Sequence, residues 1–167
     1  MADLGFDGLI SVWWVATIAD MSAPKAATEI GAAGTVTLHT RLTPDGLATG
    51  AGSDTIDTSK MSSTFNTKIV GRRNFDGLQL TYVRGDAVNE KLLDTTLVYR
   101  ASGYLVVRRD KLSTTAIAAS DKVEVYPCQV GEPQYSSPAP NALQTVVVPL
   151  TLTADPRSTS NPATVAA

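Results

Sequence analysis

Residues 62–84 have the pattern of a long β-hairpin, and such a hairpin strongly constrains the fold around it. Both arms alternate with a period of two, and one face collects β-branched, aromatic and aliphatic residues. That face consists of Phe65, Thr67 and Ile69 in the first arm and Leu78, Leu80 and Tyr82 in the second. Asp76-Gly77 between the arms can supply the positive φ of a tight turn. A hairpin cannot bury such a face alone, so we expect further strands to cover it.

The composition suits a single domain with a sizeable core, and it contains few charged, cysteine and histidine residues. Of the 167 residues, 18% are charged, below the roughly one quarter typical of globular domains. The formal net charge is −2, so no overall basic field favours nucleic acid as a partner. Cys128 is the only cysteine and His39 the only histidine, which leaves no disulfide within the chain, zinc cluster or cysteine–histidine dyad. We expect both residues to be structural, and we predict no cofactor or metal.

Five further segments have strand character. They span residues 10–18, 35–42, 103–109, 122–130 and 142–153. The first carries bulk on both faces, with Trp13 on one and Trp14 on the other, as in a central strand or one covered by a partner subunit. Core packing of both indoles and contact of one with a neighbouring subunit are alternatives. The run is too short to cross a bilayer, so no membrane segment is expected.

Residues 85–98 form the best helix candidate. Asp86 can cap the N-terminus, and an apolar stripe at helical spacing would pack against the strands. The stripe consists of Val88, Leu92, Leu93 and Leu97. A shorter helix of about two turns is predicted within residues 22–31, with Ser22 or Asp20 as its cap and Gly31 at its end.

These elements predict one mainly β domain over residues 1–153, a β-sandwich or partly closed barrel flanked by one α-helix. Residues 1–8 would form a short acidic arm. Residues 154–167, rich in Pro, Ser, Thr and Ala, would form a mobile tail. Residues 47–60 predict a mobile surface loop with a short strand near residues 54–57. Asp54 and Asp57 in it are too few for a metal-binding loop.

Four stretches contain the most distinctive sequence motifs of the chain. They are V-W-W-V-A-T-I-A-D-M-S-A-P-K-A-A (residues 12–27), L-T-P-D-G (residues 42–46), G-Y-L-V-V-R-R (residues 103–109) and V-Y-P-C-Q-V-G (residues 125–131). None is chemically unique. In this order, in a chain of this length, they resemble the major tail tube protein of long-tailed, siphovirus-like bacteriophages, especially those of actinobacteria.

The resemblance implies a structural protein of the virion tail, assembled in the cytoplasm of the bacterial host. Six copies would form a ring whose inner sheets join into one β-barrel around a lumen. Rings would stack along a tape-measure protein, with tail tip and tail terminator proteins as further partners. Double-stranded DNA would later pass through the lumen without sequence-specific binding. The sequence itself offers no nucleophile and base pair, so we expect no enzyme activity.

One departure concerns charge. Lumens in this family are typically lined with negative charge, whereas residues 58–73 carry four cations and no acid. Either this stretch does not face the lumen throughout, or its cations pair with acidic residues of a neighbouring ring or subunit. The candidate contacts between rings or subunits are Asp3, Asp7, Trp13, Trp14, Asp54, Asp57, Lys68, Arg72 and Arg73.

Two alternatives compete with a tube subunit. A tail terminator, head–tail joining or capsid decoration protein could share a related β-sandwich, but a terminator would form only closed rings. A nucleic-acid-binding module could use the pairs Arg72-Arg73 and Arg108-Arg109. No aromatic stacking platform alternates with those pairs, which disfavours that interpretation.

Overall fold

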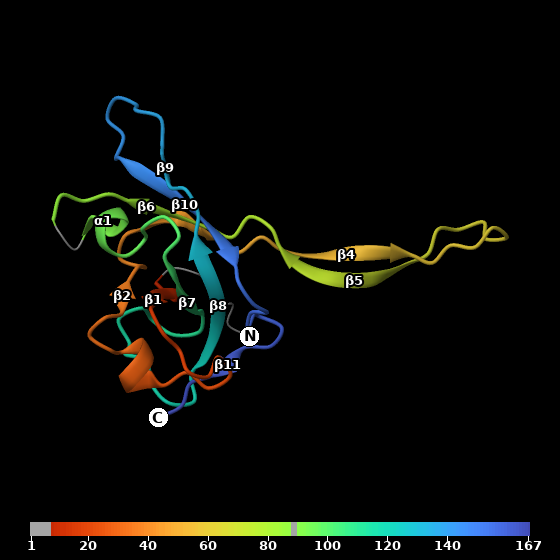
Figure 1. Cartoon of the computed structure of the whole chain (residues 1–167), viewed down its shortest axis with the longest axis horizontal. Coiled ribbons are helices and arrows are strands. Elements are labelled where there is room, and N and C mark those ends of the chain that lie inside the picture. The colour runs from red at the N-terminus through yellow and green to blue at the C-terminus, as the bar shows by residue number, and fades with distance from the viewer. Residues whose placement is uncertain (1–7, 88–89) are drawn as a thin grey trace.

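The computed structural model describes residues 8–87 and 90–167, and their secondary structure is mainly β (Figure 1). The elements in chain order are β1 (Ser11–Val15), the π-helix η1 (Ala26–Ile30), β2 (Val36–Thr37), β3 (Leu42–Ala48), β4 (Ala51–Asp57), β5 (Lys68–Phe75), β6 (Gln79–Val83), α1 (Leu92–Thr95), β7 (Ser102–Arg108), β8 (Lys122–Val130), β9 (Gln134–Tyr135), β10 (Thr145–Leu152) and β11 (Ala163–Thr164).

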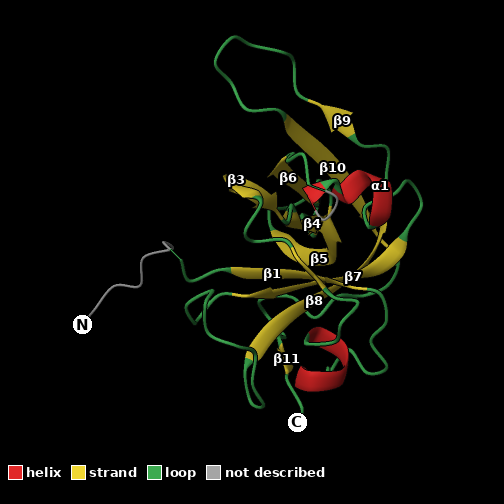
Figure 2. Ribbon diagram, turned by 90° about the vertical axis from the view of Figure 1, so that its left-hand side faces the viewer, coloured by secondary structure: helices red, strands yellow, loops and turns green. Residues whose placement is uncertain are grey.

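A curled sheet forms the body of the molecule (Figure 2). Its strand order is β2-β1-β7-β8-β10-β6-β3, with β11 paired to β8 and β9 to β10. Strand β10 joins the two halves of the sheet, because its first part pairs with β6 and its last three residues pair with β8. The partner changes directly after Pro149, which has no N–H to donate. The open, partly closed barrel predicted from the sequence is confirmed.

Each face of the sheet carries its own hydrophobic core, and strand β1 contributes to both. Val12 and Trp14 point into the larger core, which also holds Leu80, Leu105 and Val148. The other face packs the alternate β1 residues against η1 and the C-terminal segment. Trp13 and Trp14 are only 9% and 4% exposed, so the chain itself covers both faces of β1. Contact of one indole with a neighbouring subunit stays a prediction, which this small exposed fraction leaves little room for.

The helix predicted over residues 85–98 is wrong in extent. Among the described residues of this range, α-helix is confined to Leu92–Thr95, and Lys91, not Asp86, precedes it without a side-chain cap. Leu92 and Leu97 are buried in the larger core, as the stripe predicted. Val88 and the side chain of Leu93 lie outside the described residues. The helix stops at two threonines, whose β-branched side chains favour helices poorly.

The prediction that the two arms of residues 62–84 pair with each other is wrong. Strands β5 and β6 follow one another around Asp76-Gly77, but β5 pairs with β4 and β6 pairs with β3. The real hairpin therefore runs from β3 through β4, turns within residues 58–67, and returns through β5 and β6. Gly77 does adopt a φ of +94°, but this produces a kink between two strands and not a reversal. The mobile loop predicted over residues 47–60 is largely strand β4.

The C-terminal segment, predicted to be a mobile tail, packs on the sheet. Ala163 and Val165 are buried, and β11 pairs with the first residues of β8. Arg157 exchanges two backbone hydrogen bonds with Val125, of 2.8 and 2.9 Å. Period-two alternation of small apolar residues therefore outweighs the disorder-prone composition. In the described part of the chain, no helix is long and apolar enough to cross a membrane.

Candidate functional site

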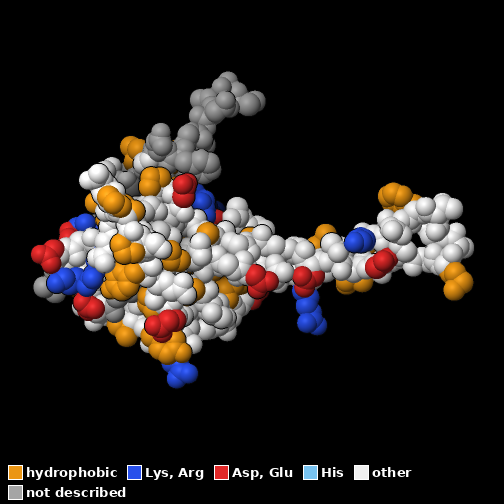
Figure 3. All heavy atoms as spheres, turned by 90° about the horizontal axis from the view of Figure 1, so that it is seen from above, with side chains coloured by type: hydrophobic (Ala, Val, Ile, Leu, Met, Phe, Trp, Pro, Cys, Tyr) orange, Lys and Arg blue, Asp and Glu red, His pale blue; other side chains and the backbone are white. Residues whose placement is uncertain are grey.

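The outer half of the hairpin, which we call the arm (residues 51–75), projects from the body as a two-stranded ribbon (Figures 1 and 3). Every residue of β4 is exposed, and β4 and β5 form a sheet of their own that is separate from the body sheet. Two-stranded ribbons are marginal in water without further packing. An arm of this length therefore indicates a surface meant for another molecule.

Cross-strand pairs explain why these residues form a ribbon. Thr55 lies opposite Val70, and Ile56 opposite Ile69, which are pairings that β-branched side chains favour. The register shifts by one residue near Asp54, where Asn74 donates a 3.0 Å hydrogen bond to the Asp54 carboxylate. Such bulges twist and bend a strand pair.

Hydroxyl groups organise the turn at the end of the arm. Thr58 donates from its N–H and its hydroxyl to the carbonyl oxygen of Thr67, at 2.9 and 3.1 Å. Ser63 donates to the carbonyl oxygen of Phe65 at 2.6 Å. Hydrogen bonds from the side chain and backbone of Ser59 hold the pKa of the Asp57 carboxyl below its usual value. The turn is thus held locally, without help from the body.

The arm exposes apolar side chains along its length and at its end (Figure 3). Phe65 is 75% exposed, Val70 is 74% exposed, and Met61 is fully exposed. Ile56 and Ile69 leave more than half of their surface in water. Five large apolar side chains exposed on one short ribbon, away from the core, indicate an interaction site. The sequence prediction missed it, because it assigned Phe65 and Ile69 to a buried face.

The predicted charged candidates gather on the arm, but their partners differ from expectation. Arg73 lies at the base of the arm, and its Nη2 donates to both carboxylate oxygens of Asp155 at 2.9 and 3.1 Å. Lys68 lies opposite Asp57 in the ribbon register. Arg72 has no ion pair among the described residues. Of the four cations of residues 58–73, Arg73 therefore pairs with an acid of its own chain and Lys68 lies opposite one. Asp3 and Asp7 lie outside the described residues.

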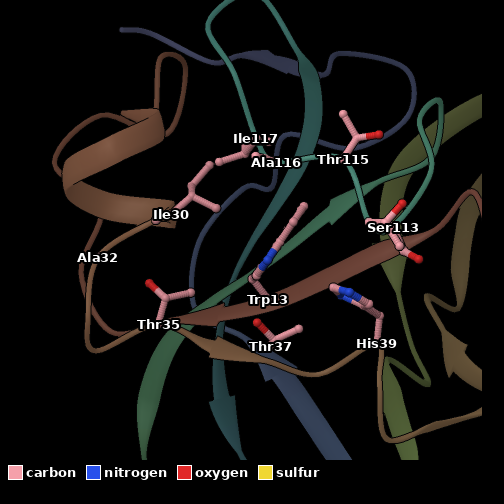
Figure 4. A pocket seen from close by; sticks show the side chains of 12 residues that line it. Trp13, Ile30, Ala32, Thr35, Thr37, His39, Ser113, Thr115, Ala116 and Ile117 are labelled. Carbon is pink, nitrogen blue, oxygen red and sulfur yellow. The ribbon is translucent and has the colours of Figure 1, made fainter.

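The structure also has a surface cavity of about 400 Å³ beside η1 (Figure 4). Trp13, His39 and Ile117 line it, together with threonine and serine side chains. The Trp13 and His39 rings meet edge to face with centroids 5.8 Å apart. Burial lowers the pKa of His39, and the His39 Nδ1 already lies 3.2 Å from both the N–H and the carbonyl oxygen of Val12. The imidazole is thus engaged in packing and backbone contacts.

Other reactive groups are also engaged. Burial raises the pKa of the Cys128 thiol to about 12, so it stays protonated near neutral pH and is a poor nucleophile. Among residues 8–87 and 90–167, no cluster of three or more His, Cys, Asp or Glu side chains could hold a metal ion. The arm is therefore the feature of the described chain that points most clearly to a function.

A buried ion pair fixes the loop between β7 and β8. The Arg108 side chain is inaccessible to solvent, and its Nη1 donates to Asp121 at 3.0 Å. Its Nη2 donates to the carbonyl oxygens of Leu112 and Thr115 at 3.0 and 2.6 Å. Its guanidinium carbon also lies 5.5 Å from the centroid of the Trp13 ring. Arg108 is a structural residue here and is closed to a nucleic acid.

Comparisons with known proteins agree with this picture. A family model described as "Phage tail tube protein" matches residues 3–165. A chain in the six-fold symmetrised cryo-EM structure of the anti-feeding prophage baseplate has a similar fold, with a TM-score of 0.57 at 11% sequence identity. The match covers 94% of this chain and 96% of that one. No curated protein sequence matches the chain.

Proposed function

The chain belongs to the phage tail tube protein family, and we propose that its copies form stacked hexameric rings that make up the tail tube. The family is a structural one and not a family of enzymes. In the proposed tube, the rings enclose a lumen through which double-stranded DNA reaches the host. Rings stack along a tape-measure protein in the host cytoplasm, between a tail tip and a tail terminator protein.

The arm is the observation that carries this proposal. It leaves Phe65, Val70 and Met61 in water, at a distance from the body that the chain's own core cannot cover. A second copy of the chain would cover this surface if each arm lay on a neighbouring subunit. Contacts between different surfaces of one chain type are heterologous, and these close into rings or continue into filaments. A stacked tube combines both outcomes.

The body sheet supports the same arrangement. Within the described chain, β3 is the last strand of the sheet at one end and the two-residue β2 the last at the other. Free strand edges are templates for pairing with another chain. Sheets of six neighbours joined at such edges would give the barrel around the lumen. Two of the four cations of the arm, Lys68 and Arg73, need not attract DNA there, because Asp57 and Asp155 lie beside them.

A tail terminator, head–tail joining or capsid decoration protein remains the alternative. The neighbour from a baseplate shares the fold only, so it does not separate these roles. A terminator would stop at closed rings, whereas a tube subunit adds rings without a fixed end. The length distribution of the assemblies therefore distinguishes the two.

The direct test is assembly of the purified chain, followed by sedimentation and negative-stain electron microscopy. Wild-type protein should form tubes of variable length. Replacing exposed apolar arm residues, as in Phe65→Ser with Val70→Ser, should abolish tubes and leave the thermal unfolding of the body unchanged. Leu112→Ser is the matched control, since Leu112 is 55% exposed but lies on the body. Equal loss of tubes in this control, or normal tubes from the arm variant, would refute the role of the arm.

A further inference from the structure

The arm joins the body through a double interruption of its two strands. The β3–β6 pairing ends at Ala48 opposite Gln79, and the β4–β5 pairing begins at Ala51 opposite Phe75. On each side of the ribbon a glycine lies in this gap, Gly50 with a φ of +55° and Gly77 with a φ of +94°. Glycine tolerates these angles without steric cost. Both strands are therefore irregular at the same point along the hairpin, where ladder pairing is interrupted, and this point forms a hinge.

The body side of the hinge is fixed. Leu78 is buried in the larger core, and its carbonyl oxygen accepts a 2.8 Å hydrogen bond from the N–H of Leu150. On the other side of the hinge, the arm is not packed into a core, as the exposure of every β4 residue shows. The direction of the arm therefore depends on the few contacts that bridge the hinge.

Those contacts lie on one face of the arm. Phe75 meets Tyr126 of β8 edge to face, with ring centroids 6.0 Å apart. Arg73 lies two residues away on the same strand and hence on the same face. It donates to both carboxylate oxygens of Asp155 and, at 3.5 Å, to the Ser160 hydroxyl. A cleft of about 280 Å³ separates this face from the C-terminal segment.

The C-terminal segment that supplies Asp155 is itself held to the body. Arg157 exchanges backbone hydrogen bonds with Val125, and the Thr159 hydroxyl donates to the Glu124 carboxylate at 2.6 Å. Glu124 is buried and is further held by Arg109 at 3.1 Å. The arm residue Arg73 is thus paired with an acid that lies two residues before a segment held to the body.

We propose that the C-terminal segment latches the arm: the Arg73–Asp155 pair, across the hinge at Gly50 and Gly77, sets the direction in which the arm projects. The latch is a property of the single subunit. Its benefit for assembly rests on the proposed tube, because arms that already point in one direction lose less conformational entropy when they dock. The pair is solvent-exposed on both sides, so it biases the arm and does not lock it.

The experiment follows the direction of the arm in monomeric full-length protein through the distance between two spin labels. The distance is measured by pulsed electron–electron double resonance. Spin labels are attached to Ser62→Cys on the arm tip and Ala119→Cys on the body, both at exposed positions. Cys128 is free but buried, so it should not take up the label. The parent should give one narrow distance distribution.

Asp155→Ala and Arg73→Ala should each broaden the distribution and lower the latched population by up to about five-fold, the range of an exposed ion pair. The swapped variant Arg73→Asp with Asp155→Arg should restore the narrow distribution. Arg72→Ala is the matched control and should leave it unchanged. High salt should broaden the parent toward Asp155→Ala.

Two outcomes would overturn the latch: a distribution for Asp155→Ala as narrow as the parent's, or equal broadening by Arg72→Ala. Because the measurement uses monomers, an unchanged arm would leave the tube proposal standing. Conversely, a failure of wild-type protein to form tubes would leave the latch standing.

Discussion

The buried pair Arg108–Asp121 offers the largest single-residue effect that the structure predicts. Asp121→Ala would leave the solvent-inaccessible guanidinium of Arg108 without an acid, although carbonyl oxygens would still accept hydrogen bonds from it. Removing one partner of a buried ion pair costs about 3–5 kcal/mol of unfolding free energy. In a chain of this size that is a fall in Tm of roughly 6–20 °C.

Thermal and urea unfolding at neutral pH measure this loss, and Lys111→Ala is the matched control. Lys111 also pairs with Asp121, but its side chain is 44% exposed, so its removal should cost only about 0–1 kcal/mol. Replacing both buried partners, as in Arg108→Met with Asp121→Leu, should recover much of the stability. If Asp121→Ala is no worse than Lys111→Ala, the reasoning about the buried charge is refuted.

The same pair predicts a pH dependence. Burial alone raises the pKa of Asp121, but hydrogen bonds from Lys111, the Ala118 N–H and Arg108 outweigh it, so the net pKa lies below 3.8. A carboxyl with a lowered folded-state pKa stabilises the fold above its unfolded pKa, and this contribution is lost as pH falls through the folded value. The stability difference between wild type and Asp121→Ala should therefore be constant above about pH 5 and shrink below about pH 4.

Three further predictions follow from other parts of the chain. Leu97→Ala should lower the unfolding free energy by about 2–5 kcal/mol in urea titrations, because Leu97 is fully buried, and a neutral result would contradict its place in the core. Gly50→Ala should cost more than Gly77→Ala, because a Cβ at Gly50 would overlap the Asp76 carbonyl while one at Gly77 meets open space; equal Tm values would contradict this hinge geometry. Removing residues 1–7 should leave the Tm unchanged but slow tube growth, measured by turbidity and electron microscopy. Normal tube growth would exclude this N-terminal segment from stacking.

Local alternation in the sequence identified several strands, because period-two burial is a local property, but of the strand predicted over residues 35–42 only β2 and the first residue of β3 are strand. Residues 122–130 form β8 as predicted, residues 10–18 contain β1, and residues 103–109 overlap β7 in all but its first residue. Strand pairing is not local, and there the prediction failed. Residues 62–84 contain two strands and a turn signal, yet both strands pair with partners upstream. Asp76-Gly77 permits a positive φ without dictating a reversal.

The candidate site was predicted in part. The charged residues Asp54, Asp57 and Arg72 do lie on the arm. Only the second half of strand β4, near residues 54–57, was predicted, because Gly52, Ser53 and Asp54 have weak strand propensity. Its partner strand β5 was visible, so its exposed residues were assigned to a core. The pairing of Arg73 with Asp155 joins residues far apart in sequence, and no local signal announces it.

The most direct test of the central claim is a cryo-EM reconstruction of tubes assembled from the purified full-length chain. The account predicts stacked rings of six subunits, with each arm lying on a neighbouring copy and with Phe65 and Val70 buried in that contact. Isolated closed rings, or a tube in which the arms remain in solvent, would contradict it.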